Sequence, residues 1–439
     1  MRLDTTSWPE LHNALRAARP VPMGEVSAVA GLGLQVSGLQ VPVGTVLEIG
    51  TGQLRAEVVA AHKDLLHCMP LGELRDITVG DFAHIGGRET MVPVGSGLLG
   101  RVLDGLGQPI DGKGPLGTHS LVALENQAPA ALERSRITEP LQLGVRVMDT
   151  LTTVGAGQRL GLFAGSGVGK SSLLSMIARG TSAEVNVIAL VGERGREVRE
   201  FLEEDLGAEG LARSIVVVST ADEPARMRLR AAFVATRIAE ELRDTGSQVL
   251  LMMDSLTRVA MAQREIGLSA GEPPATRGYP PSTFSVLAKL LERAGSGARG
   301  ATTGIYTVLV DGDDHNEPIA DAARSLLDGH IVLDRKLAVS GHFPSIDALA
   351  SVSRVASRVT NPEQGRSARL LRQVLAARRG VQDLLDVGAY QQGSNRLADA
   401  AVAHEAAINT FLQQRLEEPV AAVDSWNQLN SLLRTMGVA

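Results

Sequence analysis

A glycine-rich stretch that ends in lysine and two serines carries the clearest chemistry of the sequence. Residues 164–172 read Ala-Gly-Ser-Gly-Val-Gly-Lys-Ser-Ser and lie between an apolar run, 160–163, and a helical pattern over 173–178. Glycines let the backbone wrap so that its N–H groups point at phosphate oxygens, and the following helix adds the positive end of its dipole. Lys170 can reach the β- and γ-phosphates of a nucleotide, and the Ser171 hydroxyl can bind Mg²⁺. The stretch predicts a P-loop, with alanine in place of the usual first glycine.

An acidic residue follows the next apolar run. Residues 185–191 are apolar apart from Asn186, and Gly-Glu-Arg comes directly after them. Ligands of open α/β sheets bind at the carboxyl ends of the strands, which is where Glu193 would lie. It could polarise the water that attacks a γ-phosphate. It could equally well begin a helix and pair with nearby arginines, and the spacing alone does not decide between the two.

A second acid ends another apolar run. Residues 249–253 are all apolar and Asp254 follows them, which is the pattern of a Walker-B strand. An aspartate at the end of a strand is common by itself. After a P-loop, however, the pattern predicts that Asp254 holds Mg²⁺ through its water shell.

Composition excludes several classes of protein. The chain has 439 residues, of which 44% are hydrophobic, and its 43 lysines and arginines against 49 acids give a net charge of −6. A mildly acidic protein is a poor candidate for coating nucleic acid or anionic lipid. Cys68 is the only cysteine, which excludes an internal disulfide and fits the cytoplasm. The sequence shows no apolar signal core and no run of 18 apolar residues, so we expect neither secretion nor a membrane span.

The pattern along the chain predicts four parts. Residues 1–20 hold an amphipathic helical pattern over 7–18, which either packs on its own domain or docks onto a partner. Residues 21–90 contain short β-rich segments separated by glycines, typical of a small antiparallel barrel or sandwich. Over 91–365, apolar runs alternate with helical periods and predict a buried parallel sheet. Residues 366–439 read as helices.

Further stretches give nearly the whole chain a resemblance to a known family. The P-loop, the run Gly-Glu-Arg-Gly-Arg-Glu at 192–197 and the run Pro-Ser-Ile-Asp-Ala-Leu-Ala-Ser-Val-Ser at 344–353 resemble the rotary ATP synthase α/β-subunit superfamily. Within it, the chain is most similar to the flagellum-specific and type III secretion export ATPases, through residues 278–284, 291–295, 312–321 and 327–333. The run His-Asn-Glu-Pro-Ile-Ala-Asp and the short N-terminal segment favour the flagellar branch.

The resemblance implies a fold and an activity. We expect an α/β fold: a RecA-like P-loop NTPase core with a small N-terminal β-barrel and a C-terminal helical domain. The expected activity is Mg²⁺-dependent hydrolysis of ATP coupled to protein export, a translocase reaction. The nucleotide would be bound by Gly165, Ser166, Gly167, Val168, Gly169, Lys170, Ser171, Ser172 and Phe343, the last by stacking on adenine. Mg²⁺ would be held by Ser171 and Asp254, with Glu197 contacting a magnesium-bound water.

The resemblance also assigns catalytic roles. Glu193 matches the catalytic carboxylate of the β-type subunit, where noncatalytic α-type subunits carry glutamine. Arg194 and Arg258 match arginines that line that site. Arg354 matches the arginine that reaches the γ-phosphate held by the neighbouring subunit, although a structural salt bridge is an alternative role for it. Lys170 would neutralise charge on the phosphates.

The same resemblance implies partners. It predicts a homohexamer in the cytoplasm, at the inner face of the cytoplasmic membrane beside the export apparatus. Residues 1–20 would bind a stator-like regulator. Other partners would be a central stalk protein, a membrane export gate, and export substrates with their chaperones. The helices after 366 would bind those substrates or simply cover the end of the core.

Three rival functions compete with this one. A virulence-type (injectisome) secretion ATPase shares most of the motifs. A hexameric RNA translocase shares the core but needs a platform of aromatic and basic residues, and Phe82 is the only aromatic residue over 21–90. We therefore expect no nucleic-acid partner. A nucleotide-binding structural subunit without turnover is disfavoured by Glu193.

Overall fold

The computed structural model describes residues 21–86, 91–310 and 317–438. The segment 1–20, predicted to dock onto a partner, lies outside the described residues. The contacts divide the chain into two compact units. One runs to Thr90 and also takes in Ser269–Gly271, and the other holds the remaining residues.

The first unit is a closed antiparallel barrel in the order β1-β2-β5-β4-β3-β6. Every second side chain of a strand faces inward, so the alternating sequence fills the barrel with small aliphatic residues such as Val26, Val36 and Leu47. The predicted N-terminal β-barrel is confirmed. Its strands are β1 Met23–Ala30, β2 Gly33–Ser37, β3 Val46–Ile49, β4 Leu54–His62, β5 Leu65–Pro70 and β6 Phe82–Ile85.

The second unit is built on a mostly parallel sheet in the order β17-β16-β10-β15-β13-β11-β12-β8, in which β17 pairs antiparallel. A sheet covered on both faces needs apolar side chains on both, and this explains the continuous apolar runs of the sequence. The predicted core is confirmed. Its strands are β8 Val102–Leu103, β10 Arg159–Ala164, β11 Val185–Glu193, β12 Ser214–Thr220, β13 Gln248–Asp254, β14 Gly295–Ser296, β15 Ala301–Leu309, β16 Gly329–Val332 and β17 Val352–Ser353.

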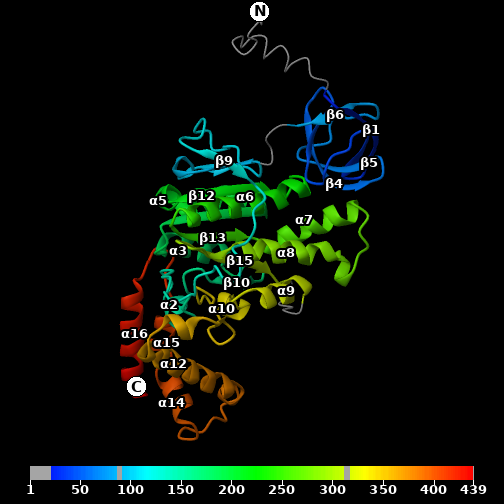
Figure 1. Ribbon diagram of the computed structural model, residues 1–439. Coiled ribbons are helices and arrows are strands. Elements are labelled where there is room, and N and C mark those ends of the chain that lie inside the picture. Colours follow the sequence, from blue (N-terminus) through cyan, green and yellow to red (C-terminus); the bar gives the residue numbers. More distant parts are fainter. Residues whose placement is uncertain (1–20, 87–90, 311–316, 439) are drawn as a thin grey trace, which may run out of the picture. The chain divides into compact units, whose positions relative to one another are not determined.

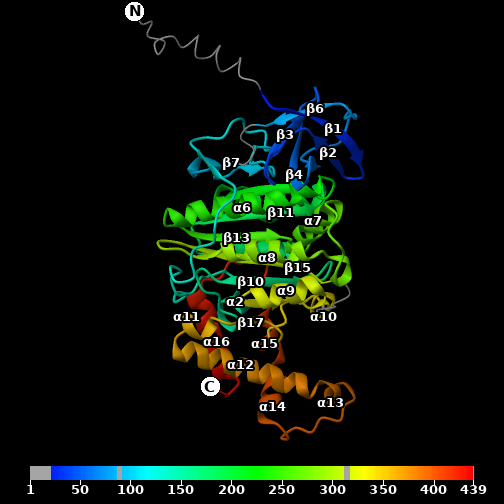
Figure 2. The same cartoon turned by 45° about the vertical axis from the view of Figure 1, so that its right-hand side comes forward.

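Helices cover this sheet. The long helix α6 packs along β11, β12 and β13 (Figure 2). It also packs on β7 of a two-stranded sheet that β7 Met91–Val94 forms with β9 Ser120–Ala123. The helices of the core are α2 Arg146–Leu151, α3 Lys170–Gly180, α4 Gly195–Glu200, α5 Gly207–Ala212, α6 Ala225–Asp244, α7 Leu256–Ser269, α8 Pro281–Arg293, α9 Pro318–Leu326, α10 Arg335–Val339 and α11 Ala356–Val359, with a π-helical turn at Phe201–Leu206.

The C-terminal helices gather at one end of the second unit (Figure 1). The first begins at a capping box between Asn361 and Gln364, with Pro362 in its first turn. Helices α12, α15 and α16 pack on α2, and their buried residues belong to the same apolar cluster as the sheet. They therefore cover the end of the core. The helices of this C-terminal region are α12 Pro362–Gly380, α13 Gln382–Asp386, α14 Arg396–Ala403, α15 Glu405–Leu412 and α16 Ala422–Thr435.

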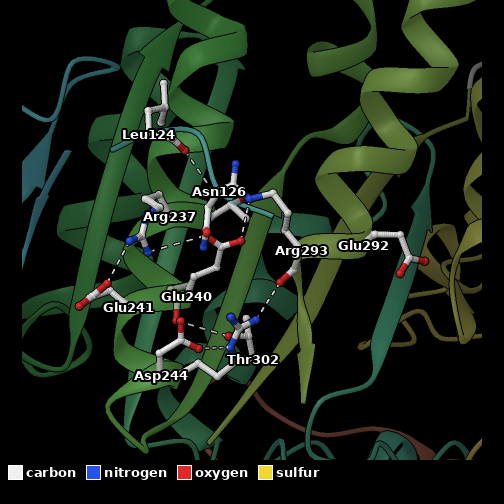
Figure 3. Close-up of polar contacts among 12 residues, drawn as sticks. Leu124, Asn126, Arg237, Glu240, Glu241, Asp244, Glu292, Arg293 and Thr302 are labelled. Carbon is white, nitrogen blue, oxygen red and sulfur yellow. Dashed lines mark hydrogen bonds and ion pairs between the residues drawn. The ribbon is translucent and has the colours of Figure 1, made fainter. Parts of the chain in front are cut away.

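A buried ion pair joins α6 to α8 (Figure 3). Arg293 donates from Nε to Glu240 Oε1 over 2.6 Å and from Nη2 to Glu240 Oε2 over 2.7 Å, and the two side chains are only 5% and 1% exposed. Asn126 Nδ2 donates to the same carboxylate over 2.9 Å. Through these hydrogen bonds, Glu240 joins α6 to α8 and to the segment after β9.

Removal of one partner of this pair should destabilise the fold. We expect Arg293→Met to lower the free energy of unfolding by about 3 kcal/mol, because buried Glu240 loses its bidentate partner and keeps only the longer contact with Arg237, at 3.8 Å. The matched control is Arg199→Met. Arg199 of α4 forms an exposed ion pair with Glu203 of the following π-helical turn, so this substitution should cost less than about 1 kcal/mol. Urea unfolding measures both. Equal losses in the two variants would contradict a role of burial.

Candidate active site

The glycine-rich loop connects β10 to α3, as strand, loop and helix. Gly167 and Gly169 have φ of 73° and 87°, in the left-handed region that favours glycine. Ala164 is the last residue of β10, in extended backbone that any residue adopts, which explains why alanine replaces the first glycine. The loop is held from outside by Ser345, whose Oγ donates to the Val168 carbonyl over 2.6 Å.

Lys170 begins α3 and points at two carboxylates. Its Nζ lies 2.6 Å from Asp254 Oδ1 and 3.3 Å from Glu193 Oε1. Asp254 ends β13 and Glu193 ends β11, so two neighbouring parallel strands deliver their acids to the same edge of the sheet. Thr307 of β15 donates from Oγ1 to Asp254 Oδ1 over 2.6 Å and orients that carboxylate. Three sequence-predicted residues thus meet at one point.

The charges of this cluster shift one another. Burial, and after it the negative charge of Asp254, raises the pKa of the Glu193 carboxyl to about 7. Burial alone would lower the pKa of the Lys170 ammonium, but the charges of Asp254 and Glu193 outweigh it and raise that pKa above its ordinary value. Glu193 can therefore exchange a proton near neutral pH, whereas Lys170 stays a cation.

The donor set of this site fits Mg²⁺. Ser171 lies in the first turn of α3, beside Lys170, and its side chain is exposed. Among the described residues no group of three or more histidine, cysteine, aspartate and glutamate side chains could hold a metal ion. A cation here would take one hydroxyl and one or two carboxylates, and its other ligands would be phosphate oxygens and water. Oxygen ligands of this kind are those that Mg²⁺ prefers in nucleotide sites.

The other charged residues predicted near Glu193 differ in how far they are buried. Glu197 of α4 hydrogen-bonds Glu193 and contributes to its raised pKa. Arg194 is exposed and pairs with Glu197 over 3.4 Å, outside the Lys170 cluster. Arg258 of α7 packs against Gly192. A Cβ added at Gly192 would lie 2.9 Å from the Cβ of Arg258. The buried Nε of Arg258 has no hydrogen-bond partner within the described part of the chain.

Arg354 lies outside this cluster in its own chain. It follows the edge strand β17, its side chain is exposed, and its Nη2 donates to the carbonyl of Arg324 over 3.1 Å. In the ranges that the structure describes, no carboxylate forms an ion pair with it. The side chain is thus presented on the surface of the unit.

Phe343 lies beside the loop and opens onto a cavity. Its ring is 45% exposed, and a Cβ on Gly169 would lie 3.3 Å from it. The cavity, of about 860 Å³, is lined by Phe343 and by C-terminal residues that include Phe411 and Gln414. Phe343 is among the residues predicted from sequence, whereas Phe411, Gln414 and Thr307 are not, because a residue inside a helical or strand pattern carries no signal of such a position.

Comparisons with known proteins agree with this geometry. Residues 144–353 match the nucleotide-binding domain of the ATP synthase alpha/beta family, and residues 360–431 match the T3SS EscN ATPase C-terminal domain. The chain is 50% identical to the flagellum-specific ATP synthase of Bacillus subtilis, covering 93% of this chain and 94% of that one. It is also 50% identical to the type 3 secretion system ATPase of Xanthomonas euvesicatoria, covering 98% of each.

Solved structures are similar as well. The assembled ATPase EscN of the enteropathogenic Escherichia coli type III secretion system is 42% identical, with a TM-score of 0.89, covering 93% of this chain and all of that one. The structure of EscN in complex with its central stalk EscO gives a TM-score of 0.87 at the same coverage. On these matches, the chain belongs to the ATP synthase α/β family and, within it, to the flagellar and type III secretion ATPases.

Proposed function

We propose that this protein is the ATP-hydrolysing motor of a flagellar type III protein export apparatus and works as a ring of identical subunits. The contact of Lys170 with both Asp254 and Glu193 at the end of a P-loop carries the proposal. Relatives named for flagella and for type 3 secretion match at the same 50% identity, so a virulence-type secretion ATPase is the second candidate.

Catalysis of phosphoryl transfer to water consists mainly of positioning and charge neutralisation. The loop amides of residues 165–169 and the ammonium of Lys170 would bind the β- and γ-phosphates. When bound by Ser171 and Asp254, Mg²⁺ supplies further positive charge to the phosphate oxygens. Arg258, packed against Gly192, lies at the same edge of the sheet, and its guanidinium would add a further cation there.

Glu193 would orient the attacking water and accept its proton. A carboxylate does this well when its pKa is close to the working pH, and burial together with Asp254 raises the pKa of Glu193 to about 7. Glu197, hydrogen-bonded to Glu193, would hold a water in the same region. The base of the nucleotide would stack on Phe343, whose exposed ring faces the cavity.

The negative charge on the γ-phosphate needs one more cation, which we assign to Arg354 of a neighbouring subunit. Its guanidinium is exposed after an edge strand and lies apart from its own Lys170. An arginine delivered from next door makes each site depend on an interface, and head-to-tail interfaces close into rings. A homohexamer is the ring that we propose.

The remaining partners extend this assignment. Residues 1–20 would bind a stator-like regulator. The domains would be the barrel at 21–90, the ATPase domain at 91–365 and the helical domain at 366–439. The helical domain would meet export substrates and their chaperones. A central stalk protein would lie in the ring, since the relative EscN forms a complex with its central stalk EscO. No helix among the described residues could cross a bilayer, and we propose a peripheral position at the inner face of the cytoplasmic membrane, beneath the export gate.

The first test removes the ammonium. We expect Lys170→Ala to lower ATP turnover by about 10²–10³-fold and to weaken nucleotide binding, because a preorganised charge on the phosphates is lost. Phosphate release measures turnover, and Lys289→Ala, on the helix α8, is the control with the same substitution.

The same allele placed in cells tests the biological role. A flagellar motor predicts that the Lys170→Ala strain stops swimming. Normal swimming together with a loss of virulence-type secretion would assign the protein to the second candidate, and normal ATP turnover by the purified variant would place the site elsewhere.

The second test concerns the carboxylate. Glu193→Gln should retain ATP binding and lose hydrolysis. In the wild type, turnover should fall as the pH decreases through about 7, because the raised pKa of Glu193 means that the base is protonated below that value. A pH–rate profile measures this. A rate that is flat from about pH 6 to 8, or unchanged turnover in the variant, would remove Glu193 from this role.

The third test asks whether Arg354 acts across an interface. Arg354→Ala alone should lose about 10³–10⁵-fold in turnover. Mixed rings of Arg354→Ala and Glu193→Gln subunits should regain part of the activity, because some interfaces then combine an intact Glu193 with an intact Arg354. If mixed rings form, as shown by native mass spectrometry, and no activity returns, delivery from the neighbour is contradicted.

A further inference from the structure

A buried glutamine with every side-chain hydrogen-bonding group in use lies behind the Phe343 cavity. Gln414 is 6% exposed and follows the end of α15 by two residues. Its Oε1 accepts from the Arg146 N–H over 2.8 Å, and its Nε2 donates to the carbonyls of Gly144 over 2.7 Å and Glu418 over 2.6 Å. A side-chain amide whose donors and acceptor are all paired holds its own backbone in one position.

That backbone in turn holds Phe343. The N–H of Gln414 donates to the Phe343 carbonyl over 3.0 Å. Two residues further on, Ser345 is bonded to the Val168 carbonyl of the P-loop. Phe343 is therefore fixed on one side to the loop that binds phosphate and on the other side to Gln414, and its ring lies against Gly169.

Arg146 completes the junction. Its Nη1 donates to the carbonyls of Thr410, Phe411 and Gln413, each over 3.0 Å, and its guanidinium lies 5.9 Å from the centre of the Phe411 ring. These carbonyls come from the last turn of α15 and the residues after it, where a helix leaves carbonyls without partners. Arg146 and Gln414 thus bind the start of α2, in the nucleotide core, to the end of α15.

We propose that Gln414 is a positioning residue for the nucleotide base and the link between base binding and helix α15. The inference rests on the proposed function, in which the base stacks on Phe343. An exposed ring contributes more binding energy when its place is fixed beforehand, because the ligand then does not have to order it. Coupling is also reciprocal: if the junction shapes the base pocket, the bound base must stabilise the junction and α15.

Kinetics with and without the base test the first part. In Gln414→Leu we expect the KM for ATP to rise about 5- to 30-fold, equivalent to about 1–2 kcal/mol, with kcat within about twofold of the wild type. The inhibition constant of tripolyphosphate, which has no base, should not change, because the P-loop is intact. Gln373→Leu is the control, since Gln373 lies exposed on α12.

Several outcomes would overturn the role. If Gln414→Leu has the same KM as Gln373→Leu, the glutamine does not position the base. If ATP and tripolyphosphate weaken equally, or if kcat falls with unchanged KM, the variant has a general structural defect and the assignment is wrong. A wild-type protein that neither hydrolyses ATP nor binds tripolyphosphate would instead refute the proposed function itself.

Hydrogen exchange tests the second part, the link between base binding and α15. Its main comparison uses the wild type and so does not depend on the folding of a variant. In the wild type, ADP should slow exchange of the amides of α15, and pyrophosphate, which lacks the base, should not. In Gln414→Leu the ADP effect should shrink, although Phe411 still lines the cavity. Equal protection of α15 by ADP and pyrophosphate in the wild type would overturn the link.

Discussion

The ammonium of Lys170, shared between the carboxylates of Asp254 and Glu193, is the interaction on which the site depends. Two acids this close to each other and mostly buried repel, and a cation between them makes the arrangement tolerable. The geometry that brings them together belongs to the fold, because β11 and β13 are parallel neighbours and end at the same edge. A shift of β11 or β13 by one residue would turn Glu193 or Asp254 to the other face of the sheet and separate it from Lys170.

This charge balance also supports the proposed contribution of a cation from a second copy. One lysine against two carboxylates leaves a net negative charge, to which a nucleotide adds more. Backbone amides and a helix dipole offset part of it, and the rest calls for a divalent cation and a further arginine. Within one chain, Arg258 packs against Gly192 at this edge, whereas Arg194 is exposed and paired with Glu197, and Arg354 lies beside the edge strand β17. A cation from a second copy, as proposed for Arg354, would add positive charge that the described cluster lacks.

Local patterns made much of this predictable from sequence. Glu193 and Asp254 each come after an apolar run, as does the loop that ends in Lys170, and parallel strands bring their carboxyl ends to one edge of the sheet. The meeting of these three residues could therefore be anticipated. Thr307 could not be found in this way, because it lies within an apolar strand and acts through a neighbour 53 residues away in sequence. Gln414 contacts Gly144 across 270 residues, a distance at which a single sequence carries no signal.

The position of Gln414 bears on how such an enzyme could perform work. The proposed phosphate site lies at the sheet edge, whereas the proposed base cavity is lined partly by helices from the C-terminal end of the chain. A nucleotide that filled both places would connect the P-loop to α15, because its phosphates and its base belong to one molecule. Because Arg146 and Gln414 bond α15 to the core through backbone carbonyls and amides, a base bound in this cavity would be coupled to the helix. The proposed base site would thus link nucleotide binding at the sheet edge to the C-terminal helices, the part of the chain proposed to meet the cargo.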